Sequence, residues 1–231
     1  AESVAIWEDL GIASMVAYRR IPLGFAKVHL GQYEEAGALA RAGLDAAQQA
    51  GDAGKMGFAW LVLGWVALAR RAYAEALRCL QKSADFSQAV VAQDQMGETL
   101  ALMGYGARGL GQPLHARRYL GEALRIAADL DVCVPLVLAL PAIALLQADE
   151  GEVEQAVELY ELARRYPFVA NSRWFEDVVE RHITAVTASL PPDVSATAQG
   201  RARERDLQAT AAALLTELRA LSSAPRPRDA P

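Results

Sequence analysis

The chain has 231 residues, of which 53% are hydrophobic and 22% are charged, and its formal net charge is −5. This mild acidity argues against a general nucleic-acid-binding protein, because such proteins normally present a basic face. The two cysteines, Cys79 and Cys133, lie far apart and form no CxxC pair. That spacing argues against a disulfide scaffold or a zinc site and is typical of buried thiols in a reducing cytoplasm.

Secretion and membrane insertion are both disfavoured by the pattern of apolar residues. Glu2, Glu8 and Asp9 interrupt the apolar stretch at the start of the sequence, whereas a secretion signal has an uninterrupted apolar region. The most apolar run, residues 132–146, carries two prolines and is shorter than the roughly 20 residues that span a bilayer. We therefore expect a cytoplasmic protein without a membrane partner.

The dominant pattern is an internal repeat of fixed period. Segments 30–36, 70–76, 110–116 and 150–156 are variants of one sequence, and each ends in an alanine: Ala36, Ala76, Ala116 and Ala156. The period is therefore 40, and a fixed period in this range indicates a solenoid built from one supersecondary unit. We expect an all-α solenoid in which each unit is a helical hairpin.

In chain order, residues 1–10 are expected to be the end of a helix from a preceding repeat. Four units follow at residues 11–51, 52–91, 92–130 and 131–166. Residues 167–221 should form helices that cap the open end of the array, which solenoids need for solubility. Within this cap, Asn171 or Ser172 should cap a helix that runs to about Leu190, and one long helix should run from Ser195 to about Leu221. The proline-rich residues 222–231 should be disordered.

Glycines mark the turn inside three of the four hairpins, at Gly31, Gly111 and Gly151. Glycine readily adopts the positive φ with which a helix commonly ends. Arg71 replaces the glycine in the second unit, so we expect that turn to be slightly strained or differently built.

A second set of glycines lies inside the first helices, at Gly24, Gly64 and Gly104. A glycine inside a helix costs about 1 kcal/mol relative to alanine, so its recurrence indicates that another helix backbone approaches closely there. Pro22 and Pro141 also fall inside first helices, and we expect the helices of the first and last units to bend or break at these prolines.

The repeat resembles the tetratricopeptide repeat, whose signature is a large residue, then Leu-Gly, a later Gly-x-Tyr and a further Ala. The second unit matches best, at Trp60, Leu63, Gly64, Tyr73, Ala76 and Leu80. In the first unit Arg20 takes the place of the large residue, and the fourth unit lacks the Leu-Gly glycine and the tyrosine. The resemblance covers about residues 12–166 and implies a right-handed superhelix of helical hairpins.

The period of 40 exceeds the usual 34 of this repeat, and it is similar to the repeats of MalT-like and AfsR-like bacterial regulators. These proteins are signalling ATPases of the STAND class, and their repeats form a sensor arm C-terminal to a nucleotide-switch domain. Residues 165–177 look like the closing section of such an arm. The sequence contains no GxxxxGK[ST] loop for an ATPase.

The sequence shows no pattern that points to catalysis, a metal or a cofactor. The three histidines, His29, His115 and His182, have no metal-ligand partner at helical spacing, and we expect them at the surface or in turns. No serine or cysteine lies in a known nucleophile motif, and the acidic pairs lie in expected turns, where they are typical of solvated charge. We therefore expect no enzymatic activity.

The inner groove of a tetratricopeptide superhelix is lined by the first helices, and the position after Leu-Gly usually faces it. Here that position holds Phe25, Trp65, Tyr105 and Leu145, which recur with the same period. The neighbours one turn away complete the candidate groove: Tyr18, Ile21, Phe58, Leu61, Glu98, Ala101, Arg108, Leu138 and Asp149. These side chains either pack between units or form an apolar groove for a peptide, a helix or a small ligand.

The main hypothesis is a non-catalytic sensor and interaction module, the C-terminal arm of a MalT-like regulator, whose partner is a protein, a peptide or a small-molecule effector. The alternative is a self-association module, a homo-oligomer in which the groove is filled by another chain or by the chain's own C-terminal helix. Binding of nucleic acid by this chain is disfavoured by its negative charge.

Overall fold

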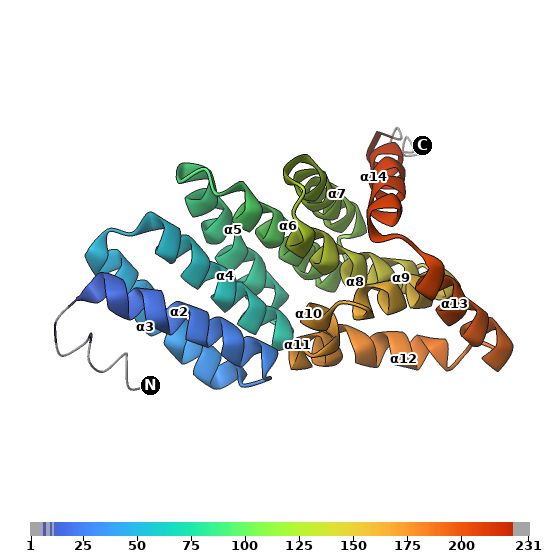
Figure 1. Ribbon diagram of the computed structural model, residues 1–231, viewed down its shortest axis with the longest axis horizontal. Coiled ribbons are helices and arrows are strands. Elements are labelled where there is room, and N and C mark those ends of the chain that lie inside the picture. Colours follow the sequence, from blue (N-terminus) through green and yellow to red (C-terminus); the bar gives the residue numbers. More distant parts are fainter. Residues whose placement is uncertain (1–6, 8–9, 11, 224–231) are drawn as a thin grey trace, which may run out of the picture.

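Figure 1 shows the computed structural model of the chain, which describes residues 7, 10 and 12–223. Over these residues the protein is all-helical, and its helices pack in sequential adjacent pairs. Each pair also packs on the next, through α3 on α4, α5 on α6 and α7 on α8. The α-solenoid-like architecture expected from the repeat period is confirmed.

Four hairpins make up the stack. They are formed by α2 (Ala13–His29) with α3 (Tyr33–Ala50), α4 (Ala53–Ala69) with α5 (Tyr73–Ala89), α6 (Gln93–Gly109) with α7 (Pro113–Leu130), and α8 (Cys133–Asp149) with α9 (Val153–Arg164). In the fourth hairpin the first helix, α8, is buried over most of its length because α6, α7 and α9 pack around it. The second helices α3, α5 and α7 are amphipathic and bury one face of small and branched residues.

A residue with positive φ ends each of these helices except the last, and these residues recur every 20 positions. The turn residues inside hairpins are Gly31, Arg71, Gly111 and Gly151, and those between hairpins are Gly51, Val91 and Asp131. Arg71 adopts φ of 58°, so the turn without glycine has the same left-handed geometry, and the expected strain is present. Each repeat is therefore made of two halves of equal length.

The glycines inside the first helices make room for the paired helix, as expected, but the contacting group differs between units. A Cβ atom at Gly64 or Gly104 would lie 2.5 or 2.6 Å from the side chain of Leu80 or Leu120. In the first unit the corresponding residue is Ala40, and a Cβ at Gly24 would lie 3.1 Å from the backbone oxygen of Ala36. The backbone itself thus approaches only where the facing side chain is small, and elsewhere a leucine fills the space.

The two prolines do not break their helices. Pro22 lies inside α2 and Pro141 inside α8, and both helices continue through the proline. Of the two expected outcomes, the break is absent at both positions, and the bend stays a prediction. Each proline removes one backbone hydrogen bond, and packing of these helices against their neighbours holds them together.

Residues 167–187 leave the end of the fourth hairpin and turn back along the first helices. We call this segment the strap. It comprises α10 (Pro167–Ala170), α11 (Arg173–Phe175), the π-helical turn η1 (Glu176–Glu180) and α12 (Arg181–Thr187). It contacts α9 and α8 of the last hairpin, α4 of the second and α2 of the first. In Figure 1 the strap lies beneath α8 and α9 and reaches the ends of α2 and α4.

The C-terminal residues form two helices, not the single long helix expected from Ser195 to Leu221. α13 (Pro192–Glu204) packs on α9, and α14 (Leu207–Ser223) packs on α7. The chain breaks here because other groups satisfy both helix ends. Arg165 donates hydrogen bonds to the carbonyl oxygens of Ala202 and Arg205, and the Asp206 carboxylate accepts one from the backbone N–H of Ala209.

The expectations at the two termini lie mostly outside the described residues. Of residues 1–10 the structure describes only Trp7 and Leu10. Of the expected disordered tail 222–231, Ser222 and Ser223 belong to α14 and the rest is not described. The expected cap at Ser172 is present by position only, because the Ser172 side chain makes no capping bond and pairs with His29 instead.

Val91 is the most strained of the turn residues, and replacing it tests the geometry of the turns. A β-branched residue at positive φ is a backbone outlier, and the left-handed region costs an L-residue roughly 1–2 kcal/mol. Val91 has φ of 57° and its side chain is 74% exposed. We expect Val91→Gly to raise the free energy of unfolding by about 1 kcal/mol, measured by urea denaturation.

The matched control is the preceding valine, which is also exposed. Val90 has φ of −104°, so Val90→Gly relieves no strain and should lower the free energy of unfolding by about 0.5–1 kcal/mol. A loss of stability in Val91→Gly equal to that in Val90→Gly would contradict the strained turn.

Candidate binding groove

The first helices α2, α4, α6 and α8 form one continuous surface, which we call the first-helix face. Four of the predicted groove residues, Phe25, Phe58, Trp65 and Tyr105, contribute to an aromatic cluster on this face. The rings of Phe25 and Phe58 have centroids 5.8 Å apart, and Phe25 lies 5.8 Å from Trp65. Residues from three hairpins are thus brought together, as their shared spacing requires.

The strap completes this cluster with three aromatic rings of its own, from Phe168, Trp174 and Phe175. The Trp174 ring centroid lies 4.4 Å from that of Trp65 and 5.3 Å from that of Tyr105. The Trp174 indole N–H donates a 2.9 Å hydrogen bond to the backbone oxygen of Trp65. Both Trp174 and Phe175 are fully buried. The first-helix face is therefore occupied by the chain's own strap.

Polar contacts hold the strap at both ends of the array. At the first hairpin, the Tyr33 hydroxyl donates a 2.7 Å hydrogen bond to Asp177, and His29 Nδ1 and Ser172 Oγ share one of 2.7 Å. At the far end, Arg164 pairs with Glu180 at 3.5 Å. The strap thus joins residues that are more than 140 positions apart in the sequence.

A charged group anchors the strap in the middle of the stack. Arg108 donates two hydrogen bonds of 2.7 Å to the Asp149 carboxylate, and His182 Nε2 lies 3.4 Å from the same carboxylate. Burial and the positive charge of Arg108 lower the pKa of His182, while Asp149 opposes this shift. Two predicted groove residues, Arg108 and Asp149, therefore contact the strap through polar groups.

The remaining predicted groove residues lie elsewhere or are fully packed. Tyr18 is 51% exposed, and the Lys55 ammonium lies 4.9 Å from its ring centroid. Ile21 is buried against α3, where a Cβ at Gly43 would lie 2.5 Å from it. Neither belongs to the aromatic cluster. Four further residues are buried in the core between the helices: Leu61, Ala101, Leu138 and Leu145.

Glu98, the second acidic residue of the predicted groove beside Asp149, is partly buried. Burial, with a smaller contribution from Asp94, raises the pKa of Glu98 to about 7. Near neutral pH this carboxyl group is therefore half protonated, and as an acid it can donate a hydrogen bond.

His29 is the last residue of α2, beside the hairpin turn as expected, but its ring is enclosed by aromatic side chains instead of exposed. Its ring lies between Phe25 at 4.7 Å, Trp65 at 5.1 Å and Phe168 at 4.9 Å, measured between centroids. Burial lowers the pKa of His29 to about 4, so the ring is neutral near pH 7. The sequence held a signal for this placement, since His29 follows Phe25 by one helical turn and occupies the same repeat position as Asp149.

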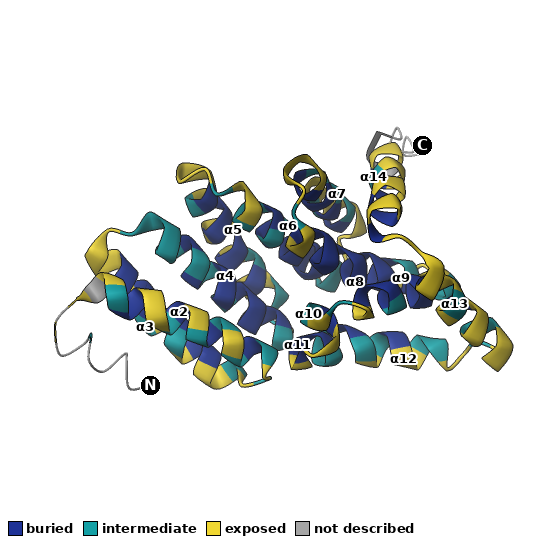
Figure 2. Cartoon of the chain, viewed as in Figure 1, coloured by how far each residue is buried: buried dark blue, intermediate teal, exposed yellow. Residues whose placement is uncertain are grey.

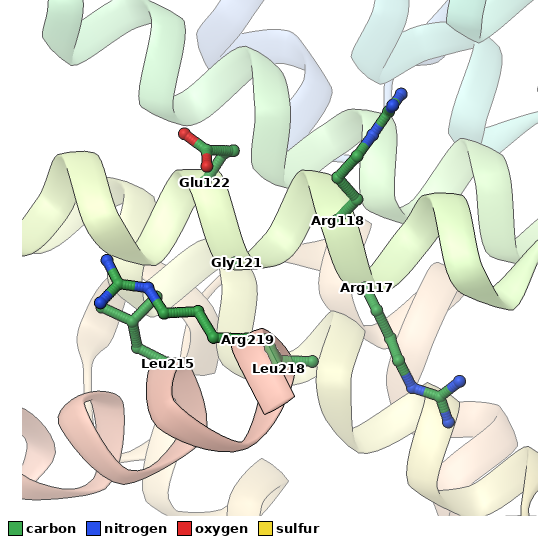
Figure 3. A pocket seen from close by; sticks show the side chains of 7 residues that line it. All are labelled: Arg117, Arg118, Gly121, Glu122, Leu215, Leu218 and Arg219. Atoms are coloured by element: carbon green, nitrogen blue, oxygen red, sulfur yellow. The ribbon is translucent and has the colours of Figure 1, made fainter. Parts of the chain in front are cut away.

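Open cavities lie in the C-terminal part of the described chain, away from the aromatic cluster. The cavity of Figure 3, about 240 Å³, lies between α7 and α14 and is lined by Arg117, Arg118, Gly121, Glu122, Leu215, Leu218 and Arg219. Its three guanidinium groups point in different directions in Figure 3. Arg117 pairs with Glu150, and Arg125 binds Glu122. These groups therefore do not converge on one anion.

Figure 2 shows that buried residues concentrate in the middle of the stack, on α4, α6 and α8, whereas α14 is largely exposed. Among the described residues, no group of three or more His, Cys, Asp and Glu side chains could hold a metal ion. No helix in the described part is both long and apolar enough to cross a membrane. In comparisons with known proteins, no protein-family model and no curated protein match the chain.

The neutral state of His29 predicts a specific loss of stability in acid. The unfolded chain binds a proton at this histidine below pH 6.5, whereas the folded chain does so only below about 4. The unfolded state therefore holds more protons in this window, and the free energy of unfolding falls as the pH decreases through it. Between pH 7 and pH 5 we expect His29 to account for a loss of about 2 kcal/mol.

Urea denaturation of the wild type and of His29→Phe at both pH values measures this contribution as a difference. Glu98 acts in the opposite direction, because its raised pKa makes the folded state bind the extra proton. The comparison with His29→Phe cancels that effect, which both proteins share. His115→Phe, at an exposed position on α7, is the matched control and should keep the wild-type dependence. An equal loss in the wild type and in His29→Phe would contradict the neutral buried histidine.

Proposed function

We propose that the protein is a non-catalytic protein–protein interaction and ligand-sensing module of the tetratricopeptide type. The observation that carries the proposal is the docking of the strap on the first-helix face. This face accepts a helical segment with adjacent aromatic side chains, Trp174 and Phe175, and buries both of them fully. A surface that binds a helix of its own chain in this way has the shape and chemistry to bind a helix of another.

The reactive side chains support a binding role over a catalytic one. Cys79 is buried, but Cys133 is exposed, so the expectation of two buried thiols was wrong for Cys133. Partial desolvation raises the pKa of both thiols, so both are poorly suited to act as nucleophiles. His29 is enclosed by aromatic rings, and His182 is engaged with Arg108 and Asp149. Among the described residues, the hydrogen bond between a serine hydroxyl and a histidine is that of Ser172 with His29, and Ser172 is a buried residue of the strap.

The setting that we propose is the sensor arm of a bacterial regulator of the STAND class. The support is the resemblance of the long repeat units to the repeats of MalT-like and AfsR-like regulators. In such a protein, occupation of the first-helix face by a partner or an effector would shift the parent protein between its resting and assembled states.

Self-association is the second candidate function, and exposed apolar residues favour it. Val90 and Val91 lie in the turn between α5 and α6, while Leu130 and Val134 flank the turn between α7 and α8. All four side chains are at least 38% exposed. The turns of neighbouring units stack at the same edge of a solenoid, so these residues form an apolar edge on which a second copy could pack.

Selection of helical peptides from a displayed library against the intact chain tests the proposed function. We expect enrichment of peptides with adjacent aromatic residues, and we expect Phe25→Ala and Phe58→Ala to weaken their binding at least tenfold, about 1.4 kcal/mol. Both residues are only partly buried, so these changes should leave the fold intact, which circular dichroism verifies.

Leu114→Ala is the matched control, because Leu114 is 66% exposed and lies at the start of α7. It should bind the selected peptides like the wild type. A library that yields no binder at all, together with a dimeric mass in sedimentation, would instead favour self-association.

A further inference from the structure

The contact between the strap and the first-helix face is well packed but leaves polar atoms without partners. His29 Nε2 and the Trp65 indole nitrogen are both buried, and neither has a hydrogen-bond partner among the described residues. The two rings are neighbours, with centroids 5.1 Å apart, and Phe168 of the strap covers both of them. Buried polar groups in native proteins are nearly always hydrogen-bonded. The strap therefore fits this face in shape but leaves these two polar atoms of it without a partner.

The strap itself contains an irregular turn where it meets the aromatic cluster. The π-helical turn Glu176–Glu180 follows Trp174 and Phe175 directly. Such turns are rare in helices and are frequent at functional sites. Here the turn lies between the two aromatic residues that enter the face and the part of the strap that carries His182. The segment thus adopts a non-standard helical geometry in its docked position.

The strap can separate from the array without unravelling the hairpins. Pro167 begins it, and Pro191 and Pro192 follow its last helix, so prolines interrupt the helix on both sides. The polar contacts that hold it, Tyr33 with Asp177 and Arg164 with Glu180, are only partly buried, and contacts of this kind contribute little to stability. Docking therefore depends chiefly on the buried apolar residues of the strap, which are Trp174 and Phe175 together with Val169, Val179 and Ile183.

We propose that the strap is an exchangeable, self-inhibitory ligand of the first-helix face, and that its competitor is a helix of a partner protein. This inference rests on the proposed function and names the partner's chemistry. The competing helix carries two adjacent aromatic residues followed by a carboxylate, which takes the place of Asp177 at the Tyr33 hydroxyl. It also supplies a hydrogen-bond acceptor, a side-chain amide or a carbonyl oxygen, to the Trp65 indole N–H. That acceptor is what the strap lacks, and it favours the partner in the exchange.

A fluorescein-labelled synthetic peptide of residues 167–190 is the probe, and the full chain is its receptor. In the wild type the strap competes with the peptide from within the same molecule, so binding should be weak. Asp177→Ala with His182→Ala removes two polar contacts of the strap and leaves its aromatic residues and the first-helix face in place. We expect the peptide to bind this variant at least tenfold more tightly than the wild type, measured by fluorescence anisotropy.

A second variant, Trp174→Ala with Phe175→Ala, empties the aromatic cluster and should bind the peptide more tightly still. If this variant fails to fold, the first variant decides the question alone. The matched control peptide carries the Trp174→Ala and Phe175→Ala changes and should bind none of the proteins. Equal binding of the intact peptide to the wild type and to the folded variants would overturn the proposal.

Two outcomes separate this inference from the proposed function. In the first outcome, library peptides bind the wild type and bind Phe25→Ala equally well. The protein would then still have an interaction role, but the proposed exchange at the first-helix face would be overturned. Variants that double their mass in sedimentation, with the strap of one copy on the other, would show that the occupant is a second copy and not a partner helix. That result would overturn the proposal as well.

Discussion

The regular length of the helices is the constraint on which the rest of the structure depends. From Gly31 to Gly151 a residue with positive φ ends a helix every 20 positions. Each residue turns an α-helix by about 100°, so one extra residue in any helix would rotate all later side chains to another direction. Because the lengths are equal, Phe25, Trp65 and Tyr105 reach the same surface. The alignment of the first-helix face is thus a consequence of the turns, including the three that use Arg71, Val91 and Asp131 in place of glycine.

A solenoid of this kind normally depends on contacts between neighbouring units, and the strap changes that situation. The hydrogen bond from Trp174 to the backbone of Trp65 joins residues 109 positions apart, and that between His29 and Ser172 joins residues 143 positions apart. The last hairpin therefore leads directly to a contact with the first. The strap therefore connects the hairpins to one another across the stack. Loosening it affects every first helix that it contacts.

The repeated part of the fold could be predicted from the sequence, and the strap could not. Helix pairs, turns and the shared face all follow from one period, so each unit supports the interpretation of the others. Residues 167–187 have no counterpart in the repeats, and their partners lie in distant hairpins, so local pattern could reveal a helix there but not where it docks. The break at Asp206 was missed for a related reason, because Arg165, which satisfies the end of α13, is distant in the sequence. The groove residues show the same division. Spacing placed Trp65 and Tyr105 on the first-helix face, where both contact Trp174, whereas the enclosure of the His29 ring also needs Phe168 of the strap. The repeat period determines which direction a side chain takes, and its burial depends on what packs over it.

The balance of energies in the docked strap follows from these contacts. Burial of two large apolar side chains such as Trp174 and Phe175 contributes about 3–6 kcal/mol. Two buried polar atoms without partners, on His29 and Trp65, cost roughly 2–6 kcal/mol in total. Val169, Val179 and Ile183 of the strap are buried as well, and the hydrogen bonds from Trp174 and Tyr33 add to docking. Docking is therefore favoured, but the two unsatisfied atoms offset part of it. A ligand that buries the same apolar area and also satisfies the Trp65 indole would recover the share of that cost that is due to Trp65, because it gains the hydrogen bond without losing the packing.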